Sequence, residues 1–109
     1  PKVSLAGQIT GVEGYVESAA IGLLVGRMVG AKLLNREVML PPPDTALGAL
    51  AHHLITQNDD FQPMNINFGL FKSTVENLKG KKNRRERYSA YTSIAKSRFQ
   101  SWLKATSFF

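Results

Sequence analysis

The sequence contains no cysteine among its 109 residues. That absence excludes a disulfide framework, a thiolate metal site and a cysteine nucleophile within this chain. It also fits a reducing compartment, so we expect a cytoplasmic protein. With 43% hydrophobic and 20% charged residues, the chain has the composition of one folded domain and not of a disordered tail.

No apolar run reaches the ~20 residues that a bilayer requires. The most apolar stretch, residues 18–34, is interrupted by Arg27 and Lys32. A secretory signal is not visible either, because no basic start precedes an apolar run and a small-residue cleavage site. We therefore expect no membrane partner.

Acidic residues are scarce in the last third of the chain. Residues 79–109 carry nine basic side chains and one acidic one, whereas residues 1–78 carry five basic and seven acidic ones. The net charge of +6 thus arises from the C-terminal part, and an anionic partner such as RNA is expected there. The candidate RNA-binding residues are Lys81, Lys82, Arg84, Arg85 and Arg87. The alternative is a solvated helix start without a partner.

The first forty residues predict a strand, a glycine-rich turn and a long helix. Residues 3–6 form a short run typical of a buried strand, and three glycines follow within residues 7–14. Residues 15–34 have a largely apolar helical pattern, in which small residues recur every fourth position from Ser18 to Gly30. Such a face suits close packing, and we expect the helix to lie against a sheet.

The middle of the chain predicts a stiff connector and a second helix. Three prolines at residues 41–43 cannot continue a helix, and Asp44 or Thr45 can cap a helix from Ala46 to about Thr56. His52 and His53 point about 100° apart on such a helix, which argues against a shared metal ion. No metal site and no catalytic residue is assigned.

The last part predicts a loop at residues 58–60, a short strand or extended segment at residues 64–71 and a final helix. The helix has an apolar face made of Tyr88, Tyr91, Ala95, Phe99 and Trp102. We expect a mainly helical chain with one or two short strands. Its predicted divisions are residues 1–40 (strand, glycine turn and helix), 41–78 (linker, helix and extended loop) and 79–109 (basic helix).

Three motifs, in order, resemble one protein family. They are AGQITGVEGYVESAAIG at residues 6–22, PPPDTALGAL at residues 41–50 and FQPMNINFGLF at residues 61–71, followed by the basic KKNRRERY at residues 81–88. Together they resemble the folate- and FAD-dependent tRNA uracil methyltransferases known as TrmFO, and more distantly the GidA/MnmG flavoproteins. The roles of Asn65 and Asn67 stay open between folate or tRNA contacts and backbone hydrogen bonds in a loop.

The resemblance implies a FAD-binding function for the glycine turn. The implied cofactor-binding residues are Gly7, Gln8, Thr10, Gly11, Val12 and Gly14. Family members transfer a methylene group from methylenetetrahydrofolate to C5 of the T-loop uridine of tRNA, with reduced FAD and NAD(P)H as the source of electrons.

This chain has no GxGxxG motif and no thiol, both of which the family carries on other segments. We therefore expect a C-terminal part of a Rossmann-like FAD-binding protein, inactive by itself. Its expected partners are the remainder of the FAD-binding domain and tRNA, and as an isolated segment it is expected to self-associate. The alternatives are a small basic nucleic-acid-binding module and a structural interaction module.

Overall fold

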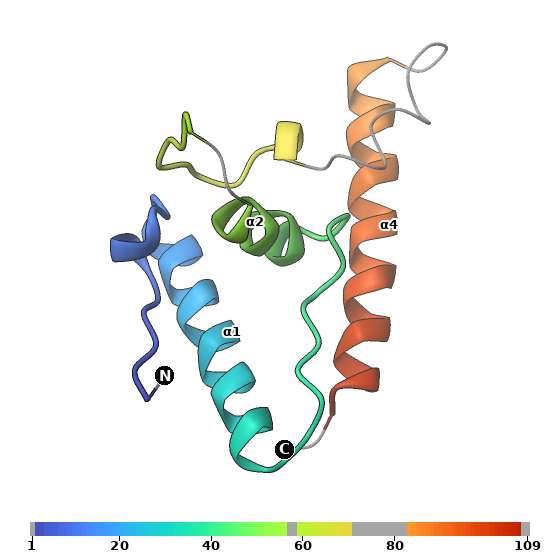
Figure 1. Cartoon of the computed structure of the whole chain (residues 1–109). Helices are drawn as coiled ribbons and strands as arrows, with labels where there is room; N and C mark the ends of the chain where they lie inside the picture. The colour runs from blue at the N-terminus through green and yellow to red at the C-terminus, as the bar shows by residue number, and fades with distance from the viewer. Residues whose placement is uncertain (1, 57–58, 71–82, 108–109) are drawn as a thin grey trace. The chain divides into compact units, whose positions relative to one another are not determined.

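The computed structural model of the chain describes residues 2–56, 59–70 and 83–107. Its elements are the 3-10 helix η1 (Gln8–Thr10), α1 (Tyr15–Leu33), α2 (Ala46–Ile55), the 3-10 helix η2 (Phe68–Leu70) and α4 (Arg84–Ala105) (Figure 1). The described part is mainly helical, as the sequence predicts. It divides into two compact units, one of residues 1–39 and 54–65 and one of residues 40–53 and 66–109.

Helix α1 agrees with the predicted helix within one residue. Gly14 is its N-cap, and Ile21, Leu24 and Ala31 are its buried residues. The four-residue row of small side chains lies on another face, where a Cβ atom added at Gly22 or Gly26 would meet nothing within 4 Å. No sheet within the described residues covers that face. Among the described helices, none is long and apolar enough to cross a membrane.

The predicted strand at residues 3–6 is wrong. These residues have no regular secondary structure, and Val3 is 76% exposed. A strand needs a neighbour to satisfy its backbone N–H and C=O groups, and the described residues contain no second strand beside this one.

Of the two predictions for residues 64–71, a short strand or an extended segment, the strand is wrong. Only Met64 makes a β-bridge, and residues 68–70 turn into η2. The turn has a local cause, because the Asn67 side-chain Oδ1 accepts a hydrogen bond of 2.9 Å from the Gly69 N–H. Such side-chain to backbone bonds compete with strand pairing. Phe71 lies outside the described residues, as does Asn58 of the predicted loop.

Helix α2 begins at Ala46, shortly after the prolines at residues 41–43, which prevent the helix from starting earlier. Thr45 is the N-cap, since its Oγ1 accepts a hydrogen bond of 3.0 Å from the Gly48 N–H and donates one of 2.6 Å to the Pro42 carbonyl. Gly48 is buried against the carbonyl groups of Pro41 and Pro42. The close approach of helix and proline segment therefore depends on a residue without a side chain.

Helix α4 packs through the predicted apolar face. Tyr91 and Trp102 are buried, and Tyr88, Ala95 and Phe99 are half-buried. Asn83 caps the helix, with Oδ1 accepting a 2.9 Å hydrogen bond from the Glu86 N–H. An ion pair joins this helix to the start of α2, where Arg98 Nε lies 3.3 Å from Asp44 Oδ2.

Candidate functional site

The glycine turn before α1 has a conformation that side chains oppose. Gly11 and Gly14 have φ values of 96° and 94°. An added Cβ atom at Gly11 would stand 2.5 Å from Phe61 Cζ, and one at Gly14 would stand 2.8 Å from Asn65 Nδ2. Both positions therefore combine left-handed backbone with close neighbours, which only glycine accommodates.

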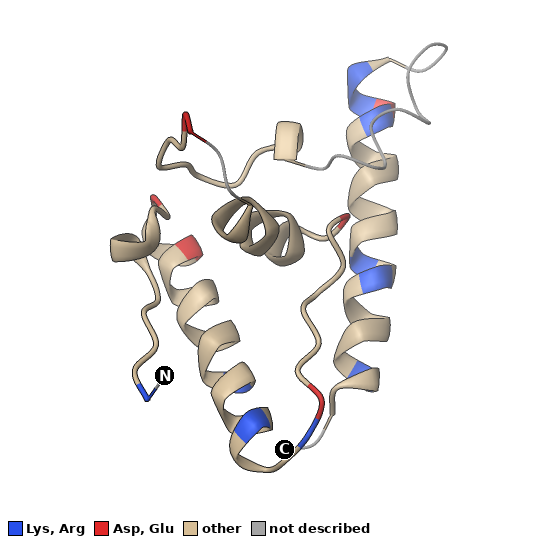
Figure 2. Ribbon diagram, in the orientation of Figure 1, with Lys and Arg blue, Asp and Glu red and all other residues tan. Residues whose placement is uncertain are grey.

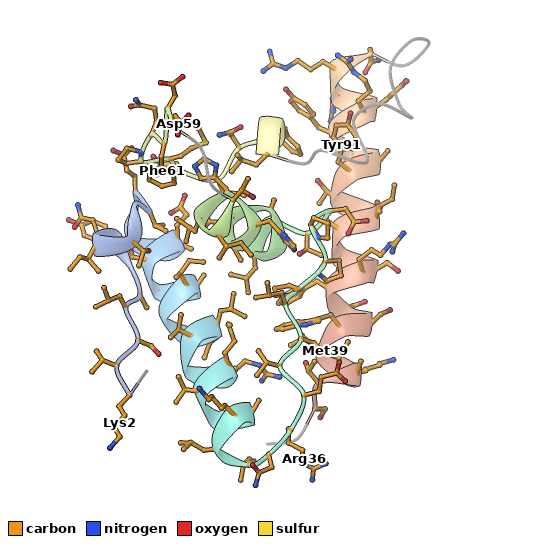
Figure 3. All side chains as sticks on the ribbon, viewed as in Figure 1. Lys2, Arg36, Met39, Asp59, Phe61 and Tyr91 are labelled. Carbon is orange, nitrogen blue, oxygen red and sulfur yellow. The ribbon has the colours of Figure 1, made fainter. Side chains whose placement is uncertain are left out.

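Backbone hydrogen bonds join the turn to the segment around Met64, about fifty residues further along the chain. Val12 and Met64 form a parallel bridge, in which the Glu13 N–H donates to the Met64 carbonyl and the Met64 N–H donates to the Gly11 carbonyl, at 3.1 and 3.2 Å. Val12 is 0% exposed, so its side chain is enclosed by protein. Figure 3 shows Phe61 in this second segment, beside the turn.

The Asn65 side chain holds the same junction together. Its Nδ2 donates to the Glu13 carbonyl at 3.1 Å and to Glu17 Oε1 at 3.5 Å. Local patterns in the sequence did not assign Phe61, Asn65 or Glu17 to this site. The sequence links residues 6–22 and 61–71 only in that both belong to the motifs that resemble one family, and it did not predict their contact.

The candidate cofactor residues differ in what they present. Gln8 is exposed at the start of η1, and its carbonyl accepts a 3.0 Å hydrogen bond from the Gly11 N–H. The Thr10 hydroxyl donates to the Gly7 carbonyl at 2.6 Å and so closes the turn. The Gln8 side chain is therefore exposed to solvent, while Gly7, Thr10 and Val12 shape the backbone of the turn.

The N-terminus of α1 follows directly. Gly14 provides no side-chain cap, so the first N–H groups of the helix have no acceptor within it. These groups and the helix dipole favour a ligand with negative charge or carbonyl oxygens. The negative charge of Glu17, in the first turn, disfavours an anionic ligand at this helix end. Its contact with Asn65 holds the carboxylate on the side of residues 61–65.

The basic candidates that the structure describes lie in the first turn of α4 (Figure 2). Arg84 and Arg85 are exposed and Arg87 is half-buried, whereas Lys81 and Lys82 lie outside the described residues. Cations in the first turn oppose the helix dipole by roughly 0.3–1 kcal/mol each. This placement is therefore unfavourable for the helix alone and becomes favourable when an anion lies beside it.

Neither histidine of α2 takes part in a metal cluster. Within residues 2–56, 59–70 and 83–107, no group of three or more His, Cys, Asp or Glu side chains could hold a metal ion. His52 and His53 are both half-buried on the helix.

Comparison with known proteins finds a matching family model and several proteins of similar sequence. The family described as "Glucose inhibited division protein A" matches residues 1–37. The methylenetetrahydrofolate–tRNA-(uracil-5-)-methyltransferase TrmFO of Cereibacter sphaeroides is 52% identical over 107 residues, which is 96% of this chain and 24% of the relative. The proteins of the same name from a Ruegeria species and from Paracoccus denitrificans are 54% and 50% identical over 94% and 98% of the chain.

These matches cover nearly the whole chain but a small part of each relative. The chain spans about a quarter (24%) of the length of the curated relatives that it matches. The three motifs of residues 6–22, 41–50 and 61–71 all lie within the matched region, since it includes almost every residue of the chain. By sequence, nearly the whole of this chain is similar to one part of the TrmFO proteins.

Proposed function

We propose that this chain is the C-terminal segment of a flavoenzyme that methylates the T-loop uridine of tRNA at C5, using methylenetetrahydrofolate and reduced FAD, with NAD(P)H as the source of electrons. The proposal rests on the 52% identity, over 96% of the chain, to the methylenetetrahydrofolate–tRNA-(uracil-5-)-methyltransferase TrmFO of Cereibacter sphaeroides. The segment alone is inactive, because a complete pyrophosphate site and the family's thiols lie on other segments.

The glycine turn is the proposed FAD contact. Gly11 and Gly14 let the turn pack closely against Phe61 and Asn65, Gln8 adds an exposed amide, and the α1 N-terminus adds the backbone N–H groups of a helix start that has no side-chain cap. Such a set suits the carbonyl edge of a flavin ring, which becomes anionic on reduction. When bound, reduced FAD would supply the electron pair that converts the transferred methylene group to a methyl group.

The remaining proposals concern neighbours of the segment. The exposed row of small residues on α1, including Gly22 and Gly26, would lie against the rest of a Rossmann-like FAD-binding domain, where a sheet meets the helix closely. In that parent, residues 1–40 would end the FAD-binding domain, residues 41–78 would link it to the last helix, and residues 79–109 would supply tRNA contacts.

Flavin content of the full-length protein tests the turn. Gln8→Ala should lower the bound flavin and weaken FAD binding, while Gln100→Ala, the same change on an exposed glutamine of α4, should leave both unchanged. Gly11→Val should release more flavin than Gln8→Ala, because it also displaces Phe61. Normal flavin absorbance and methyl transfer in a protein carrying Gly11→Val and Gln8→Ala together would contradict the assignment.

A further inference from the structure

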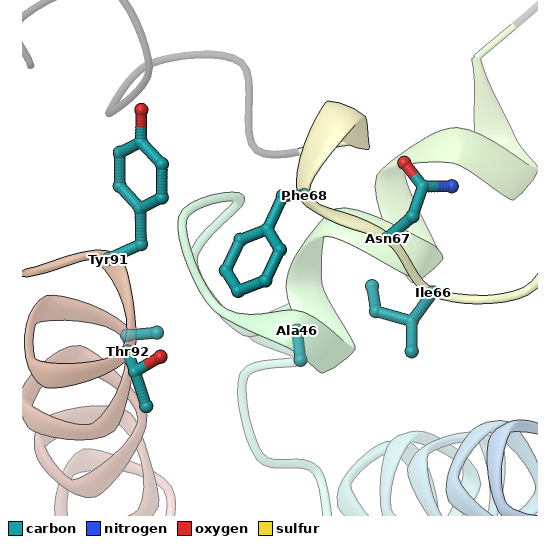
Figure 4. A pocket seen from close by; sticks show the side chains of 7 residues that line it. Ala46, Ile66, Asn67, Phe68, Tyr91 and Thr92 are labelled. Atoms are coloured by element: carbon teal, nitrogen blue, oxygen red, sulfur yellow. The ribbon is translucent and has the colours of Figure 1, made fainter. Parts of the chain in front are cut away.

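An apolar cavity lies in the unit formed by residues 40–53 and 66–109. Its volume is about 300 Å³, and its walls come from the start of α2, the segment before η2 and one face of α4. Figure 4 shows Phe68 and Ile66 facing Ala46 and Thr92 across this space. Ala46 is exposed, so the cavity opens to solvent beside the first residue of α2.

Stacked aromatic rings connect this cavity to the basic start of α4. Phe68, which lines the cavity, stacks on Tyr88 with ring centroids 4.0 Å apart and planes 4° apart. The Arg84 guanidinium lies 5.2 Å from the centre of the Tyr88 ring, and its Nε donates a 3.0 Å hydrogen bond to the Tyr88 hydroxyl. A row of guanidinium, phenol and phenyl groups therefore leads from exposed charge to the cavity wall.

The cavity surface is almost wholly apolar, and of the residues that line it Asn67, Thr92 and Tyr91 have polar side-chain groups. The Thr92 hydroxyl donates to the Tyr88 carbonyl at 2.8 Å, which leaves its oxygen able to accept from a ligand. Pockets for small molecules run from about 300 to 1,000 Å³, so this one suits a single ring system. A complete folate, with a bicyclic ring and a long tail, exceeds it.

We infer that the cavity receives one unpaired base of a bound RNA, while Arg84 and Arg85 contact the phosphates beside that nucleotide. Aromatic walls stack on any base, and exposed arginines supply the phosphate contacts that a strand needs. This inference rests on the proposed function for the choice of RNA as the anion. It adds a place for a particular base, separate from the glycine turn, which lies in the other unit.

Two variants of full-length protein test the site with a T-arm hairpin RNA as the probe. Ala46→Leu fills the cavity from its open side and should lower affinity about tenfold at every salt concentration, with an unchanged salt slope. Ala105→Leu, the same change at an exposed position of α4 that does not line the cavity, should bind as the unaltered protein does. Thr92→Val removes the hydroxyl without filling the cavity and should lower affinity two- to fivefold.

Hairpins lacking one base at each unpaired position in turn identify the nucleotide. One of them should bind the unaltered protein about tenfold more weakly, and the Ala46→Leu protein should bind that hairpin as well as the unaltered protein does. Full affinity of Ala46→Leu and Thr92→Val for the intact hairpin would overturn the inference. So would a raised KM for methylenetetrahydrofolate with unchanged RNA affinity, which would place folate in the cavity.

The binding measurements need neither folate nor flavin reduction. A protein that binds the hairpin as described but transfers no methyl group would therefore refute the proposed function and leave this inference standing. If the Ala46→Leu protein methylates tRNA normally and binds the hairpin with unchanged affinity, this inference is refuted and the proposed function stands.

Discussion

Replacing Gly48 with alanine should destabilise the chain, although alanine is the better helix former. An added Cβ atom would stand 2.5 Å from the Pro42 carbonyl carbon and 2.6 Å from the Pro41 carbonyl oxygen. Favourable contacts between such atoms lie near 3.5 Å, and the Pro42 carbonyl oxygen would stand nearer still, so α2 and the proline segment would have to separate by more than about 1 Å. Backbone atoms form the obstacle, and no side chain can rotate away to relieve it.

The magnitude follows from three effects. Overpacking of this kind costs about 1–3 kcal/mol, and stretching the Thr45 cap costs up to about 1 kcal/mol more. The higher helix propensity of alanine returns about 1 kcal/mol. Because backbone atoms form the obstacle, the overpacking cost lies at the upper end of its range, and we expect the free energy of unfolding to fall by about 2–3 kcal/mol.

Urea unfolding of the 109-residue chain, followed by far-ultraviolet circular dichroism at the same protein concentration for every variant, measures this change. The matched control is Gly26→Ala, where an added Cβ atom meets nothing and the free energy of unfolding should rise by about 0.5–1 kcal/mol. The two identical substitutions should thus shift the midpoint in opposite directions. A Gly48→Ala chain as stable as the unaltered one would refute the close contact between α2 and the prolines.

Three further predictions use other parts of the molecule. Replacing Arg84, Arg85 and Arg87 together with alanine should weaken the binding of all tRNAs to the full-length protein. The salt dependence of binding should become shallower by about one unit of log slope per lost phosphate contact, and the flavin content should stay unchanged. A variant with wild-type affinity and salt slope would assign these residues to solubility. Arg98→Met should lower the urea midpoint more than Lys104→Met, because it leaves the Asp44 carboxylate buried without its ion-pair partner. The isolated 109-residue chain should form dimers or larger assemblies through exposed apolar residues such as Leu23, and light scattering that shows a monomer at all concentrations would contradict this.

Local patterns were sufficient for the helices. The apolar period and glycines around residues 15–34, and the prolines followed by Thr45, mark the ends of α1 and α2 within one or two residues of where they lie. The apolar face of α4 was predictable for the same reason, since helical spacing places Tyr91 and Trp102 on one side. These elements satisfy their backbone groups within a few residues, so the local sequence carries most of the information about where they begin and end.

The strand predictions failed because strands depend on neighbours. Residues 3–6 have strand-like composition but no described partner, and residues 64–71 contain Asn67, whose side chain favours a turn over pairing. The contacts of the glycine turn with Phe61 and Asn65 could not be derived from local patterns either. They join positions about fifty residues apart, and helix or strand periodicity carries no information about such pairs.

The bridge between Val12 and Met64 determines when the glycine turn can fold during synthesis. Bringing together residues 52 positions apart, as between Glu13 and Asn65, costs about 3–4 kcal/mol of chain entropy. The ribosome completes α1 and α2 before Met64 emerges, so both helices can form while the glycine turn still lacks its partner segment. A shortened chain that ended before residue 64 would keep every glycine of the turn and would have nothing to hold them in shape. The glycine turn can therefore take its final shape only after residue 64 has been synthesised, although that residue lies about fifty positions further along the sequence.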